Sequence, residues 1–198
     1  MIRSLRAALI VFALLVVATG IVYPLLVTGL AQVLFPHQAN GSLIRENGKV
    51  VGSRLIGQYF DQPQYFWGRP SATDPVPYDA ENSGASNLGP TNPELVRHVQ
   101  ERVARLRAAD PADGDRPVPV DLVTSSMSGL DPDISIAAAR YQLARVAQAG
   151  HLPQAQVAAL IQRYTRPAVL GFIGEPRVNV LELNLALHRL YQQQGKAQ

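Results

Sequence analysis

The sequence predicts an α+β fold in which one N-terminal transmembrane helix precedes a single mixed α+β extracytoplasmic domain. Three patterns predict it: a charge-free apolar run from residue 7, an Asn-Gly pair between two alternating runs, and later segments with apolar residues at helical spacing. We expect a cytoplasmic N-terminus over residues 1–6, an anchor helix over 7–34 and the extracytoplasmic domain over 35–198.

The anchor is predicted from its length and composition. Residues 7–36 contain no charged side chain and are mostly Leu, Val, Ile and Ala. Lipid cannot hydrogen-bond a peptide group, so such a run is stable in a bilayer only as a helix, and roughly 20 residues suffice to cross. Pro24 removes one backbone donor and predicts a kink. A signal peptide cleaved near Ala18 is the alternative, but the apolar run continues through Val27, which exceeds the usual length.

The charges around the anchor predict its orientation. Arg3 and Arg6 precede the run, and the next Lys or Arg is Arg45. Because cytoplasmic flanks favour Lys and Arg, the N-terminus should lie in the cytoplasm and the rest of the chain outside it. We therefore expect a single-pass protein of the inner (cytoplasmic) membrane.

Four small residues are candidates for packing against other membrane helices. They are Thr19, Gly20, Thr28 and Gly29. Small side chains let helix backbones approach closely in lipid, although such residues also occur singly in helices that contact only lipid.

Composition excludes several classes of function. The chain has no cysteine, so disulfides and thiolate chemistry do not apply. After Arg3 and Arg6 are set aside, 16 basic residues face 15 acidic ones. A nucleic-acid interface needs clustered positive charge, so we expect no nucleic acid as a partner. The apolar anchor makes membrane lipid an expected partner.

The first part of the domain should contain a hairpin and a long ordered loop. Asn47-Gly48 between alternating runs predicts a type I′ turn, with strands over residues 42–46 and 49–55. Residues 57–90 are rich in Pro, Gly, Asn and Ser, which predicts a loop region. The aromatic residues within it favour packing over disorder.

The remainder should be mostly helical, because several segments carry helix start and stop signals. The expected helices run from a cap at Asn92 to Asp110, from Ser135 to about 149 with Gly150 as the stop, from 153 to 164, and onward from a cap at Asn179. A short strand is expected over residues 118–124.

No arrangement in the sequence predicts catalysis. Phosphate-binding Gly-Lys loops, dinucleotide fingerprints and Gly-x-Ser-x-Gly are absent. The histidines lack metal-ligand spacing, and turn or cap roles explain the clustered serines and acids. These residues are His37, His98, His151, His188, Ser125, Ser126, Ser128, Asp131 and Asp133. We expect an anchored binding or assembly subunit with no metal and no tightly bound cofactor. An exported sensor or ligand-binding domain and an anchored hydrolase are the alternatives.

An ordered set of short motifs covers nearly the whole chain. Its main members are Thr19-Gly20, Tyr23-Pro24-Leu25-Leu26, Ala39-Asn40-Gly41-Ser42, Gly68-Arg69-Pro70-Ser71-Ala72, Asn92-Pro93-Glu94-Leu95, Ser128-Gly129-Leu130-Asp131, Val178-Asn179-Val180 and Glu182-Leu183-Asn184-Leu185-Ala186-Leu187. With these motifs the chain resembles the C subunit of the bacterial high-affinity potassium-transporting ATPase, the Kdp complex.

The resemblance implies a non-catalytic accessory subunit that supports assembly and activity of an ATP-driven potassium import pump. Its partners would be a channel-like potassium-binding subunit and a P-type ATPase subunit. The family is described as a catalytic chaperone that raises the ATP affinity of the ATPase subunit. Gln142 matches the family glutamine linked with nucleotide.

The predicted orientation conflicts with a direct nucleotide role for Gln142. ATP is cytoplasmic, whereas the charge asymmetry places Gln142 outside. This subunit would then be linked with ATP only through the complex. The alternative to a nucleotide role is that the Gln142 side-chain amide hydrogen-bonds neighbouring residues or a partner.

Overall fold

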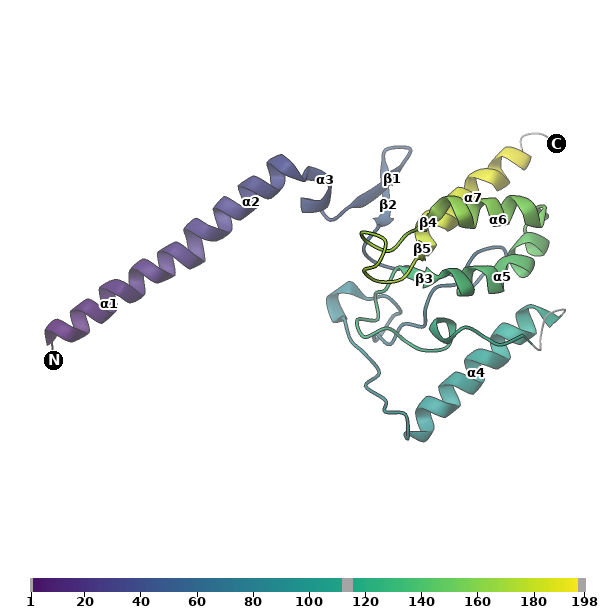
Figure 1. Ribbon diagram of the computed structural model, residues 1–198, viewed down its shortest axis with the longest axis horizontal. Helices are drawn as coiled ribbons and strands as arrows, with labels where there is room; N and C mark the ends of the chain where they lie inside the picture. Colours follow the sequence, from purple (N-terminus) through teal and green to yellow (C-terminus); the bar gives the residue numbers. More distant parts are fainter. Residues whose placement is uncertain (1, 112–115, 196–198) are drawn as a thin grey trace. The chain divides into compact units, whose positions relative to one another are not determined.

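The computed structural model describes residues 2–111 and 116–195, and the chain divides into two compact units at Val51 (Figure 1). The first unit holds a long helix, a short helix and most of a hairpin. The second unit, from Gly52 onward, holds the remaining helices and a small sheet. The structure therefore confirms the α+β class and, within these described residues, one N-terminal apolar helix.

The apolar run forms one continuous helix of 33 residues, Ile2–Leu34. It comprises α1 (Ile2–Val17), a π-helical turn η1 (Ala18–Val22) and α2 (Tyr23–Leu34). No residue of α1 or α2 is buried within the chain. Length and composition make this helix a candidate membrane span.

The irregularity caused by Pro24 takes the form of a wide turn. The proline ring would crowd the carbonyl of the residue four positions earlier, Gly20, which lies inside η1. A π-helical turn widens the backbone at this point and accommodates the ring. In Figure 1 the helix continues nearly straight through η1, and the expected kink at Pro24 is not seen.

The hairpin prediction is confirmed. After the short helix α3 (Pro36–Ala39), strands β1 (Leu43–Glu46) and β2 (Lys49–Ser53) pair with each other. The turn residues Asn47 and Gly48 have φ angles of 50° and 80°, as a type I′ turn requires. Strand β2 ends two residues earlier than expected.

We predict that Gly48→Val destabilises this hairpin by about 1–3 kcal/mol, because a β-branched residue resists positive φ. Amide hydrogen exchange of residues 43–53 in the full chain should become faster. Gly89→Val is the matched control, since Gly89 is not in the left-handed region and an added Cβ there meets nothing within 4 Å. Equal protection in both variants would show that the turn does not depend on Gly48.

The second unit is built on a three-stranded antiparallel sheet with the order β3-β5-β4. The strands are β3 (Asp133–Ser135), β4 (Thr165–Arg166) and β5 (Arg177–Asn179). Helices α5 (Ile136–Ala149), α6 (Gln154–Tyr164) and α7 (Val180–Gly195) complete this part. The fully buried apolar side chains that form the core include Phe66, Ala138, Ala139, Val146, Val157, Val178, Leu183 and Leu187.

Three predicted helix caps are confirmed. Asn92 accepts from the backbone N–H of Glu94 at 2.9 Å and starts α4 (Pro93–Ala109). The cap residues of α5 and α7 are Ser135, which accepts from Ala138 at 3.0 Å, and Asn179, which accepts from Glu182 at 3.1 Å.

Gly150 ends α5 as predicted, but not through a left-handed conformation. Its φ is −92°, and the positive φ belongs to His151. A Cβ on Gly150 would lie 2.4 Å from the hydroxyl of Tyr191. The glycine is therefore required by close packing against α7.

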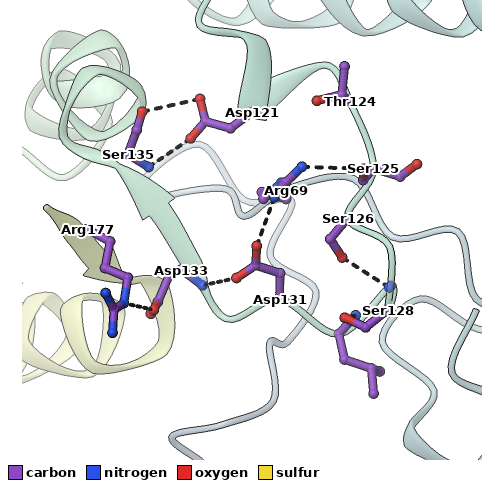
Figure 2. Close-up of polar contacts among 12 residues, drawn as sticks. Arg69, Asp121, Thr124, Ser125, Ser126, Ser128, Asp131, Asp133, Ser135 and Arg177 are labelled. Carbon is purple, nitrogen blue, oxygen red and sulfur yellow. Dashed lines mark hydrogen bonds and ion pairs between the residues drawn. The ribbon is translucent and has the colours of Figure 1, made fainter. Parts of the chain in front are cut away.

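The predicted strand over residues 118–124 is wrong, because the segment contains the 3-10 helix η4 (Val120–Leu122). Pro117 and Pro119 lack the N–H groups that a strand would pair. The Asp121 carboxylate accepts from the backbone and hydroxyl of Ser135, at 2.8 and 3.2 Å, and fixes the turn (Figure 2).

The long segment over residues 57–90 is ordered, as its aromatic residues predicted. Its only regular element within the described chain is the 3-10 helix η2 (Ala80–Asn82). Phe66 is fully buried, and Phe60 and Trp67 pack against the core. Long-range contacts of this segment define the candidate site.

Candidate functional site

Gln142 lies on the buried face of α5 and is 1% exposed. Its carbonyl oxygen accepts from the backbone N–H of Trp67 at 2.8 Å and from Arg145 at 2.7 Å. Its amide nitrogen donates to the carbonyl oxygens of Trp67 at 3.0 Å and Ala138 at 3.4 Å. A carboxamide offers two donors and two acceptor lone pairs, so these contacts use its full capacity.

Asn184 on α7 holds the neighbouring residue in the same way. Its carbonyl oxygen accepts from the backbone N–H of Phe66 at 2.9 Å, and its amide nitrogen donates to the Phe66 carbonyl at 2.9 Å. Gln142 and Asn184 thus bind the backbones of two consecutive residues. We call this pair of side chains the amide clamp.

Arg145 extends the hold on the same segment. One guanidinium nitrogen donates to the carbonyl oxygens of Pro63 and Tyr65. The guanidinium carbon lies 4.1 Å from the centre of the Trp67 ring, a cation–π arrangement. Burial lowers the pKa of Arg145 to about 10, while the carboxylate of Asp110 acts in the opposite direction.

An aromatic cluster covers the start of the clamped segment. The Tyr65 hydroxyl is 2.9 Å from Nδ1 of His188, and its ring centre lies 6.1 Å from that of Tyr191. The Tyr191 hydroxyl donates to the carbonyl of Gln64 at 2.8 Å. Burial raises the pKa of the Tyr191 hydroxyl from its ordinary value of 10 to about 12.

A cleft of about 220 Å³ lies beside Trp67. Its charged lining residues are Arg69, Arg102 and Arg105. Arg69 pairs with Asp131 at 2.9 Å, Arg102 donates to the carbonyl of Val123 at 2.8 Å, and Arg105 lies over the Trp67 ring at 4.7 Å. Small-molecule pockets usually measure about 300–1,000 Å³, so this cleft is small for a ligand site.

The clustered serines and acids have structural roles (Figure 2). The Ser126 and Ser128 hydroxyls accept from the backbone N–H groups of Gly129 and Leu130. Asp131 accepts from the backbone N–H of Asp133 and pairs with Arg69.

The histidines have no metal-site geometry within the described residues. No group of three or more His, Asp or Glu side chains there could hold a metal ion. His188 contacts Tyr65 and Gln192.

The small residues of the apolar helix do not form one stripe. Thr19-Gly20 and Thr28-Gly29 are nine residues apart, which is two and a half turns at 3.6 residues per turn. The two pairs therefore point to different sides. A Cβ on Gly20 or Gly29 would meet nothing within 4 Å, so each leaves an open notch.

Sequence reasoning singled out Gln142 only through a resemblance and gave no role to Asn184 or Arg145. The backbone groups held by the amide clamp lie 75 residues from Gln142 and 118 residues from Asn184 in the sequence. Those bound by Arg145 lie 80 or more residues away. The one signal in the sequence that could have pointed to Gln142 is an amide among the apolar residues of a predicted helix.

Comparison with known proteins gives matches along nearly the whole chain. The family model described as KdpC: K+-transporting ATPase, c chain, matches residues 5–189. A relative from Methylibium petroleiphilum named Potassium-transporting ATPase KdpC subunit is 60% identical over 183 residues, which cover 92% of this chain and 95% of the relative. A relative of the same name from Sorangium cellulosum is 59% identical over 187 residues, covering 94% and 98%.

Proposed function

The chain belongs to the KdpC family, the c chain of the K⁺-transporting ATPases, and from this premise we propose that it is a non-catalytic accessory subunit of an ATP-driven potassium import pump. The match of the family model to residues 5–189 is the observation that carries the proposal. Within the described residues, Ser126 and Ser128 accept hydrogen bonds from turn backbone groups, and Asp131 pairs with Arg69.

The proposed partners are the channel-like potassium-binding subunit and the P-type ATPase subunit of the same pump. In this proposal the helix Ile2–Leu34 spans the inner membrane beside them, and Thr19-Gly20 and Thr28-Gly29 contact two different neighbouring helices. The second unit then lies outside the cytoplasm, over the outer mouth of the potassium path. Arg3 and Arg6, in the first turns of this helix and before its charge-free apolar run, support this orientation.

Gln142 is proposed to act as a structural residue of the amide clamp. Its donors and acceptors are engaged by Trp67, Ala138 and Arg145, so a nucleotide could bind it only by displacing buried hydrogen bonds. An effect of this subunit on ATP affinity would then pass through its contacts with the ATPase subunit.

The orientation can be tested by cysteine labelling, because the natural chain has no cysteine. Met127 is 90% exposed, so a thiol in Met127→Cys should react with a membrane-impermeant maleimide in intact spheroplasts. Ser4→Cys, at the other end of the predicted span, should react only after lysis. Labelling of Ser4→Cys alone before lysis would reverse the proposed orientation.

A further inference from the structure

The loop between β4 and β5, whose course is drawn in Figure 1, carries exposed apolar side chains. Its four large apolar residues are Val169, Leu170, Phe172 and Ile173, with exposed fractions of 54%, 79%, 78% and 51%. We call residues 168–174 the apolar tip. Single exposed apolar residues are common, but four within five positions form a patch that is costly to leave in water.

The apolar tip has a defined conformation. Val169 and Ile173 exchange two backbone hydrogen bonds of 2.9 Å. Gly171 and Gly174 supply positive φ angles of 83° and 78°, and Leu170 itself has a φ of 55°. An ordered loop loses less conformational entropy on binding than a flexible one, so the tip is preorganised for a partner.

An apolar groove continues from the base of the tip. It lies between α5 and α6, has a volume of about 990 Å³, and reaches Pro167 and Pro176 at the two ends of the loop. Its α6 side is lined by Ala155, Ala158 and Ala159, which share one helix face, and further along by Ile161 and Gln162. Small side chains there let another backbone approach closely.

The charges around this surface favour a protein over a lipid bilayer. At the base of the loop, Arg166 pairs with Glu182, and Arg177 pairs with Asp133 at 2.9 Å. Glu175 follows the tip and is exposed, so it repels an anionic membrane surface. Arg140 at the groove has the opposite charge. One charge of each sign beside apolar side chains is typical of the rim of a protein interface.

We propose that the apolar tip and the adjoining groove form the docking surface for an apolar segment on a membrane-embedded subunit of the same pump. This inference rests on the proposed function. The anchor keeps both proteins in one membrane, which raises their effective concentration and allows a small patch to suffice. The large exposed side chains of the tip, Phe172 and Leu170, would supply the anchors of the interface.

Crosslinking can identify the occupant. Phe172→Cys in the full chain, labelled with a thiol-directed photocrosslinker in membranes that contain the pump, should crosslink to a pump subunit identified by mass spectrometry. Val120→Cys is the control, because Val120 is 69% exposed outside the tip and the groove. Crosslinks to lipid alone, or to a second copy of this chain alone, would overturn the proposal.

Co-purification measures the contribution of the tip. Phe172→Asp and Leu170→Asp in the full tagged chain should each lower the recovery of the pump subunits at least about tenfold, the effect of a hot-spot residue. Val120→Asp should leave recovery unchanged. Circular dichroism should be unaltered in all three variants, because the substituted side chains are exposed.

The two proposals fail in different ways. If the natural chain recovers no ATPase subunit, the proposed function fails. If the natural chain recovers it and Phe172→Asp recovers it equally well, only the docking surface is wrong.

Discussion

Gln142→Leu is expected to lower the free energy of unfolding of the full chain by about 3–5 kcal/mol, because it leaves several buried polar groups without partners. The Trp67 backbone N–H and C=O and the Arg145 guanidinium all lose a hydrogen bond. Trp67 is the only tryptophan, so urea unfolding in detergent can be followed by its fluorescence. Gln148→Leu is the matched control, since Gln148 is an exposed glutamine on the same helix.

The same variants separate a structural glutamine from a nucleotide ligand. Calorimetry of the full natural chain should detect no tight ATP binding. Gln142→Glu keeps an oxygen that accepts from Trp67 and Arg145, so this variant replaces Gln142→Leu in the ATP-binding measurement if Gln142→Leu does not fold. Tight ATP binding by the natural chain that is lost in a folded Gln142→Glu protein would contradict the clamp role. A stability loss equal to that of Gln148→Leu would contradict it as well.

Deletion of the chain is expected to abolish stable potassium-stimulated ATPase activity of the pump. The expectation follows from family membership and from the proposed contacts of both units with partner subunits. The check is potassium-stimulated hydrolysis by a complex purified through another subunit, with subunit content measured in parallel. Supply of the chain in trans should restore both assembly and hydrolysis. Full activity of a complex shown to lack the chain would remove the accessory role.

Elements that depend on neighbouring residues could be predicted from the sequence. The Asn47-Gly48 turn and the caps at Asn92, Ser135 and Asn179 are local, because each side chain or backbone conformation acts within about three residues. Their positions were therefore correct. Gly150 was correctly predicted as the stop of α5, but its close approach to Tyr191 depends on another helix and has no local signal.

Elements that depend on distant residues could not be predicted. Strands β3, β4 and β5 have two or three residues each and exist through pairing across the chain. The segment over 118–124 looked like a strand, but Asp121 binds Ser135 instead. The amide clamp joins the irregular segment around Trp67 to two helices, and no local pattern marks such a pairing.

The central claim is that this subunit supports pump activity without supplying a catalytic group. The most direct test is potassium-stimulated hydrolysis by assembled complexes that carry single alanine substitutions. The positions are His37, His98, His151, His188, Ser126 and Asp131. Each assembled variant should keep most activity, whereas loss of a general acid or base typically costs about 10²–10⁴-fold. A variant that assembles normally yet loses turnover would contradict the account.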